Sequence, residues 1–256
     1  MKPATASDEV PGSTIPVDPP ALRTGGYRRV GLTGNPFRVL APDEIVDRLI
    51  DPADLARAER ALRSRARVIE VVGHSGWGKS TRLAVLQYLG ETVLGERWVR
   101  SYVDPGANRV RPPAGPFDRW CIDEAQRITQ RRLRRIVHRA ARGDARIVLG
   151  THVSLEAFCE QPGSTFMSLH LSSPTAETIE RFIHTRVAAV LPAGHSVPPV
   201  SGAALALLDR QTAGNLHRVA EILYEVFQHY VAGGRLPASI SETDIARAIR
   251  IRPLDS

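Results

Sequence analysis

Residues 68–80, which read VIEVVGHSGWGKS, carry the most specific structural pattern in this 256-residue chain. Four of the first five residues are apolar and β-branched, as in a buried strand, and residues 73–80 match the pattern G-x-x-x-x-G-K-[ST] in full. Apolar residues at helical spacing follow from Thr81 to Leu89, and Gly90 is predicted to end that helix. A strand, a glycine-rich turn and a helix in this order predict a phosphate-binding loop rather than a chance glycine-rich turn.

The residues of this loop have separate expected roles. Its glycines allow backbone conformations that a side chain would block, so that successive N–H groups converge on phosphate oxygens at a helix N-terminus. Lys79 is expected to contact the β- and γ-phosphates of ATP, and the hydroxyl of Ser80 to bind Mg²⁺. The predicted nucleotide-binding residues are Gly73, His74, Ser75, Gly76, Trp77, Gly78, Lys79, Ser80 and Thr81.

Two adjacent carboxylates form the second informative site. The segment FDRWCIDEAQ, residues 117–126, contains an apolar strand around Trp120 to Ile122 that is followed by Asp123 and Glu124. Ligands bind at the carboxyl ends of strands in a parallel sheet, so both acids should face the phosphate loop. Asp123 is expected to hold Mg²⁺ through its water shell, and Glu124 to polarise the water that attacks the γ-phosphate. An adjacent glutamate argues against a small-molecule kinase, in which water attack would waste ATP.

The order of predicted elements gives the fold class. Strands are expected at 68–72, 97–103, 120–122, 146–150 and 166–171, alternating with helices. This α/β pattern predicts a P-loop NTPase with a parallel sheet of about five strands flanked by helices. The next part of the chain reads as helices only, which predicts a small all-α lid domain; its first helix should open at Ser173-Pro174, and the others should cover 203–212, 216–231 and 242–251.

We expect three parts along the chain. Residues 1–26 are rich in proline and small polar residues, which predicts a disordered arm that serves as a tail or a partner-binding segment. Residues 27–172 form the P-loop ATPase domain, in which Pro36-Phe37 anchors a short loop to the body of the domain and a helix starts at an Asp51 N-cap. Residues 173–256 form the lid domain.

Composition limits the compartment and the partners. The chain has two cysteines far apart in sequence, no stretch of 18 apolar residues and no apolar run at its start, so we expect a reduced cytoplasmic protein without membrane insertion. The formal charge of +7 fits nucleic acid, an anionic surface or a solvated basic face. A helix at 129–142 carries a stripe with Arg131, Arg135 and Arg142, which either contacts DNA or is solvated.

These motifs together resemble the AAA+ ATPases. The segment GNLHRV, residues 214–219, looks like the second sensor of that family and would place Arg218 against the nucleotide, while Thr151 at a strand end matches the first sensor. Within the family, the segments IDEAQ and GLTGNPF and the GN-x-x-R helix start look most like the group that includes the general-secretion ATPase ExeA and the transposition regulators TniB and TnsC. The resemblance implies Mg²⁺-dependent ATP hydrolysis, ATP-dependent homo-oligomers and a regulated protein partner, as in a DNA-bound regulator of transposition.

One departure from the family is plain. AAA+ proteins usually carry an arginine finger that acts across subunits shortly after the first sensor, but residues 147–180 contain no arginine or lysine. Arg139 and Arg142 are alternative candidates for this role.

Two other functions stay open, a monomeric P-loop phosphotransferase and a nucleotide-binding module without turnover. A two-lobed helicase is excluded, because no second motor domain fits after residue 151.

Overall fold

The computed structural model describes residues 25–49, 52–143, 145–159 and 165–251. Among these, five strands form one parallel sheet in the order β2-β3-β4-β1-β5. The strands are β1 Val68–Val72, β2 Trp98–Tyr102, β3 Arg119–Asp123, β4 Arg146–Thr151 and β5 Phe166–His170. The predicted α/β fold with a parallel sheet of about five strands is confirmed. Most of the predicted arm, and the predicted N-cap residue Asp51, lie outside the described residues.

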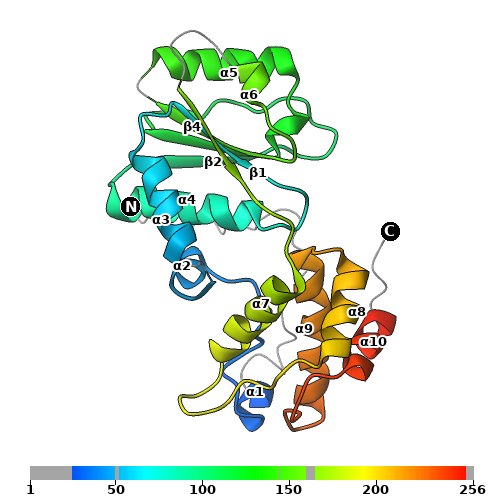
Figure 1. The fold of residues 1–256 in the computed structure, drawn as a ribbon. Helices are drawn as coiled ribbons and strands as arrows, with labels where there is room; N and C mark the ends of the chain where they lie inside the picture. The colour runs from blue at the N-terminus through cyan, green and yellow to red at the C-terminus, as the bar shows by residue number, and fades with distance from the viewer. Residues whose placement is uncertain (1–24, 50–51, 144, 160–164, 252–256) are drawn as a thin grey trace.

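Helices cover both faces of the sheet (Figure 1). The helices α3 Pro52–Arg63 and α4 Lys79–Val93 lie on one face, and α5 Gln130–Arg142 and the short α6 Glu156–Cys159 lie on the other. Every residue of β1 and β3 is buried, as expected for central strands with helices on both sides.

The helix that follows the phosphate loop corrects one prediction. Gly90 does not end it, because α4 continues through Gly90 to Val93. A Cβ atom at position 90 would lie 2.2 Å from Nε1 of Trp98, the first residue of β2. Glycine is therefore needed here for the close approach of the Trp98 ring and not for a helix end.

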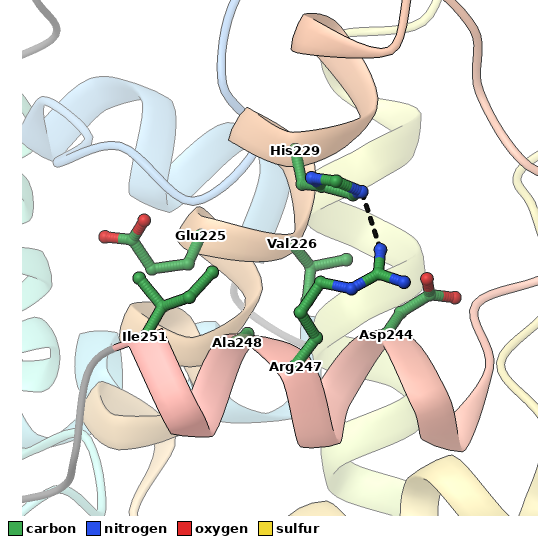
Figure 2. Close-up of a pocket in the computed structure, with 7 residues that line it drawn as sticks. All are labelled: Glu225, Val226, His229, Asp244, Arg247, Ala248 and Ile251. Carbon is green, nitrogen blue, oxygen red and sulfur yellow. Dashed lines mark hydrogen bonds between the residues drawn. The ribbon is translucent and has the colours of Figure 1, made fainter.

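The C-terminal part is helical, as predicted. It contains α7 Ala176–Ala188, α8 Gly202–Thr212, α9 Leu216–Ala232 and α10 Glu242–Ile251. The prediction that Ser173-Pro174 opens the first helix is wrong, because Thr175 is the N-cap of α7 and its side chain accepts a hydrogen bond from the backbone N–H of Thr178. Figure 2 shows α10 against α9, with Nη1 of Arg247 2.6 Å from Nε2 of His229. The hollow between them encloses only about 10 Å³.

Two short N-terminal helices were not predicted. The helix α1 Gly25–Arg29 and the loop that follows contribute Tyr27, Leu32 and Phe37 to the core of the helical part, although we expected this segment to be anchored to the α/β domain. The ring of Phe37 lies 5.6 Å from that of Phe227 in α9. The second helix, α2 Pro42–Leu49, contacts both α4 and α7 and so links the two parts of the chain. No helix within the described ranges is long and apolar enough to cross a membrane.

Candidate nucleotide site

The predicted phosphate loop lies between β1 and α4. Gly76 and Gly78 have φ angles of 77° and 89°, in the left-handed region where a side chain is strained. Lys79 begins α4 with only 5% of its surface exposed, and its Nζ donates a hydrogen bond to the carbonyl oxygen of His74, 3.1 Å away. Burial lowers the pKa of the Lys79 amine, and the nearby carboxylates of Glu124 and Asp123 oppose that shift. The buried ammonium group of Lys79 thus lies against the phosphate loop.

The carboxylate of Asp123 lies beside the hydroxyl of Ser80. Asp123 is the last residue of β3 and is 2% exposed, and its Oδ2 accepts a hydrogen bond of 2.9 Å from Oγ of Ser80, 43 residues earlier. The same Oδ2 accepts a bond of 3.0 Å from Nη2 of Arg100 in β2. The structure therefore brings the two predicted metal-binding side chains together, with a guanidinium at the carboxylate oxygen where a cation would bind.

Glu124 has an unusual backbone and a fully engaged side chain. Its φ and ψ are 61° and 37°, a left-handed conformation that costs a residue with a side chain about 1–3 kcal/mol. Its N–H donates to Oδ1 of Asp123 at 3.0 Å. Its Oε2 lies 3.0 Å from Nη2 of Arg127 and accepts a 2.8 Å bond from Gln126. The remaining oxygen, Oε1, lies 3.3 Å from Nε2 of His152.

His152 extends beyond the end of β4, next to the predicted first sensor Thr151. Thr151 is fully buried, and its hydroxyl donates a 2.7 Å bond to the carbonyl oxygen of Val153. Burial and the charge of Lys79 lower the pKa of His152, although Glu124 acts in the opposite direction. His152 is thus the side chain from this strand end that reaches the predicted base, and it favours the neutral form more than a free histidine does.

A buried carboxylate in β1 holds the turn that carries His152. Glu70 is fully buried. Its oxygens accept bonds from Oγ of Ser154 at 2.6 Å, the N–H of Leu155 at 2.9 Å and Oγ of Ser168 at 2.8 Å. Three donors satisfy this acid, as a buried carboxylate requires, and fix the turn against β1 and β5.

The helical part contacts the phosphate loop directly. The N–H of Leu216, the first residue of α9, donates a 3.0 Å bond to the carbonyl oxygen of Gly76. Asn215 is the N-cap, and its Oδ1 accepts bonds from the N–H groups of His217 and Arg218 at 3.0 and 3.1 Å. A Cβ atom on Gly76 would lie 1.9 Å from that same Oδ1. Arg218, the predicted second sensor, therefore lies in a helical turn whose start rests on the loop.

Sequence reasoning missed Arg100 and Arg127 at this site, and it placed His152 at the strand edge beside Thr151 without giving it a role. Arg100 lies in the middle of β2, Arg127 in the turn after β3 and His152 directly after β4, so none belongs to a contiguous motif. His152 has the clearest signal of the three, because it directly follows Thr151, the predicted first sensor. The arginines predicted to form one stripe on α5 are arranged differently: Arg135 lines a cavity with Arg132 and Arg139, Arg131 is exposed outside that lining, and the side chain of Arg142 is outside the described set.

The donor set fits a nucleotide with Mg²⁺. A left-handed glycine loop at the start of a helix can direct N–H groups at phosphates, and Lys79 lies over it without a carboxylate in hydrogen-bond contact. Mg²⁺ prefers oxygen ligands and usually keeps several waters, with one or two carboxylates and phosphate oxygens completing the shell. Ser80 and Asp123 supply such oxygens. The guanidinium of Arg100 at Oδ2 of Asp123 shows that a positive charge is accommodated beside this carboxylate.

Solved structures share this fold at low sequence identity. Domain III of the replication initiation protein DnaA from Thermotoga maritima matches with 15% identity over 84% of this chain and 100% of that chain, at a TM-score of 0.56. CDC6P from Pyrobaculum aerophilum matches with 14% identity over 78% and 67%, at 0.56. The Thermotoga maritima RuvB Holliday junction branch migration motor matches with 13% identity over 86% and 74%, at 0.54. No family model and no curated protein matches the chain.

These structural matches identify the fold class. The chain has the fold of the AAA+ P-loop ATPases, with the strand order β2-β3-β4-β1-β5 and a helical part after the sheet. The narrower resemblance to the group of ExeA, TniB and TnsC stays a prediction from the sequence motifs.

Proposed function

We propose that this protein binds ATP with Mg²⁺ and hydrolyses it, and that the bound nucleotide controls its assembly with itself and with a partner. One observation carries the proposal. The 2.9 Å bond between Ser80 and Asp123 joins the phosphate loop to the strand end that carries Glu124. A binding loop, a metal-binding pair and a candidate base thereby lie within one site.

Each residue has a role in this proposal. The loop N–H groups and Lys79 bind and orient the phosphates, and Ser80 and Asp123 hold the metal. Bound Mg²⁺ supplies positive charge that stabilises the phosphate oxygens. Glu124 accepts the proton of the attacking water, for which its carboxylate must be free. Thr151 and Arg218 are the predicted sensors, and the contact between Leu216 and Gly76 gives the helical part a direct route to the loop.

The state of Glu124 also supports a second candidate, a nucleotide-binding module with little or no turnover. Arg127 and Gln126 both bond one of its oxygens, and His152 lies beside the other. The oxygen Oε2 of Glu124 is already occupied by Arg127 and Gln126, so it does not accept a hydrogen bond from an attacking water in this arrangement. Turnover therefore requires Glu124 to leave Arg127, and a protein in which that never happens would bind ATP without hydrolysing it.

Three variants separate these functions. Lys79→Ala should abolish ATP binding, because no neighbouring cation replaces the lysine at the phosphates. Glu124→Gln should bind ATP normally and hydrolyse it far more slowly. Glu91→Gln, an exposed glutamate on α4, is the matched control and should behave as wild type. Nucleotide affinity and phosphate release are measured for each; equal release by wild type and Glu124→Gln would mean that Glu124 is not the base.

Assembly distinguishes the AAA+ hypothesis from a monomeric phosphotransferase. We expect size-exclusion chromatography to show a larger species with a slowly hydrolysed ATP analogue than without nucleotide. A trans-acting arginine contributes on the order of 10³–10⁵ in rate to phosphoryl transfer, so an assembly-dependent enzyme should also gain activity per subunit as its concentration rises. A monomer in both states with concentration-independent turnover would refute the assembly proposal.

We further propose that DNA is one partner, as in a transposition-type regulator. The similar fold of RuvB, a Holliday junction motor, and that of the Aeropyrum pernix ORC1 protein, solved in complex with DNA, support testing it. Duplex binding through Arg131, Arg135 and Arg142 should weaken with salt, with a log–log slope of about −0.9 per neutralised phosphate. No retention of duplex at low salt with ATP present would remove DNA from the proposal.

A further inference from the structure

A cavity of about 410 Å³ lies beside α5, between this helix and the segment that leads into β3. Its volume is within the range of roughly 300–1,000 Å³ that is typical of binding pockets. Its lining residues are Arg109, Val110, Pro112, Phe117, Trp120, Arg132, Arg135, Ile136, Arg139, Ala145 and Ile147. None of the residues assigned to the nucleotide site is among them.

The floor of the cavity is apolar. Trp120 and Ile147 are partners in the register of β3 and β4, and they are 4% and 3% exposed. The ring of Phe117 packs edge-on against that of Trp120 at 6.5 Å. The indole N–H of Trp120 donates to Oγ of Ser101, 3.0 Å away, so its one polar atom is already satisfied. The floor therefore offers contact area and no free donor.

The rim of the cavity is cationic. Arg132, Arg135 and Arg139 follow one another at spacings of three and four, so they share a face of α5, and Arg109 also lines the cavity. Arg132 donates to the carbonyl oxygen of Asn108. Within the described part of the chain, the other three have no recorded ion pair or hydrogen bond from their guanidinium groups. Among the described residues, the lining contains arginines and no carboxylate, so it is cationic.

We propose that this cavity binds an acidic segment of a partner protein, with a bulky apolar side chain of that segment in the cavity and its carboxylates on the arginines. Guanidinium groups bind carboxylates in a two-point geometry, and an apolar anchor surrounded by such contacts is how a few residues dominate an interface. DNA matches the rim but not the floor, because phosphate contacts do not use a buried apolar surface beside Trp120 and Ile147. We therefore assign Arg135 to the acidic segment, and duplex binding at Arg135 is the competing outcome that the test must exclude.

The cavity is separate from the proposed ATPase site. Trp120 and Ile147 are the second residues of β3 and β4, whereas Asp123 and Thr151 end those strands. Asp123 follows Trp120 by three positions, which is about 10 Å along the strand at about 3.3 Å per residue. The proposal therefore does not depend on ATP hydrolysis, and a failure of either proposal leaves the other testable.

The test uses a fluorescein-labelled decapeptide with a central Leu-Phe pair flanked by glutamates and aspartates, with anisotropy measured on the full chain. We expect saturable binding that weakens at least tenfold in Arg135→Glu and Arg139→Glu. Arg131→Glu is the matched control, because it makes the same charge change on the same helix outside the lining; its affinity should change less than twofold. Arg135→Gln is the milder variant should charge reversal disturb folding, with folding checked by circular dichroism. A peptide with glycine in place of the Leu-Phe pair should bind at least tenfold more weakly.

Four results would overturn the proposal. Equal losses in Arg131→Glu and Arg135→Glu would mean a diffuse charge effect, and equal binding of the glycine peptide would mean that the floor is not used. Competition by a DNA duplex that is lost in Arg135→Glu would identify the surface as a nucleic-acid site. Competition by a synthetic peptide of residues 1–24 would identify the occupant as this chain's own arm.

Discussion

Replacing Gly76 by alanine tests the contact between the phosphate loop and the helical part. Two effects add at this position. A side chain at φ 77° is in the left-handed region, which costs about 1–2 kcal/mol. The new Cβ would also lie 1.9 Å from Oδ1, 2.1 Å from Cγ and 2.7 Å from Nδ2 of Asn215, so the cap of α9 must move. Losing an asparagine N-cap costs about 1 kcal/mol.

Gly78→Ala is the matched comparison for this change. Gly78 has a φ of 89°, but its Cβ would have no heavy atom within 4 Å, so only the backbone strain applies. We therefore expect Gly76→Ala to reduce the free energy of unfolding by about 2–3 kcal/mol and Gly78→Ala by about 1–2 kcal/mol. Urea denaturation without nucleotide measures both, and a loss of 1 kcal/mol lowers Tm by about 2–4 °C in a chain near this size.

A double-mutant cycle with Asn215→Ala isolates the clash. All three atoms that Cβ would meet belong to the Asn215 amide, and alanine removes them. Asn215→Ala alone should cost about 1 kcal/mol for the cap, and in that background Gly76→Ala should cost only its strain. The two changes should therefore be less than additive by about 1 kcal/mol. Equal losses in Gly76→Ala and Gly78→Ala together with full additivity would mean that α9 does not rest on the loop in solution.

Three further perturbations test other contacts. Arg119 is fully buried and donates to Glu96 and to the carbonyl oxygen of Leu62, so Arg119→Met should reduce the free energy of unfolding by about 3–5 kcal/mol, as expected for a broken buried ion pair. The exposed pair of Arg97 and Asp118 provides the control, and Arg97→Ala should unfold within error of wild type; similar losses in both would refute the assignment. Arg100→Ala removes the guanidinium that competes with Mg²⁺ for Oδ2 of Asp123, so half-saturation of a fluorescent ATP analogue should need less Mg²⁺ than in wild type. A higher Mg²⁺ requirement in the variant would contradict this competition. The pKa of His152 is lowered from 6.5 in the folded chain, so the unfolded chain binds this proton first and acidification below about pH 6.5 reduces the stability. Between about pH 8 and pH 5, Tm should therefore fall less in His152→Gln than in wild type. Equal falls in Tm would contradict the lowered pKa of His152.

Features of the fold that depend on local chemistry could be predicted from the amino-acid sequence. A β-branched run, a glycine-rich turn and a helix start are contiguous at residues 68–80, and the strands β3 and β4 each contain an apolar run of their own. The α/β class and the position of Asp123 at a strand end followed from these local patterns. The short helices α1 and α2 did not, because helices of this length depend on tertiary contacts, such as that of Tyr27 with the helical core, more than on periodicity.

Contacts between side chains that are distant in sequence could not be predicted, because they depend on how the strands and helices pack. Gly90 resembles a helix stop in sequence, but it is required by Trp98 from the next strand. Arg100 reaches Asp123 because the register of β2 and β3 sets it beside Cys121, two residues before Asp123 and on the same face of the strand. His152 reaches Glu124 because β3 and β4 are neighbours that end at the same edge of the sheet. Such contacts depend on strand order and register, which no single segment encodes. The sequence therefore predicts the components of the candidate site, and packing determines their partners.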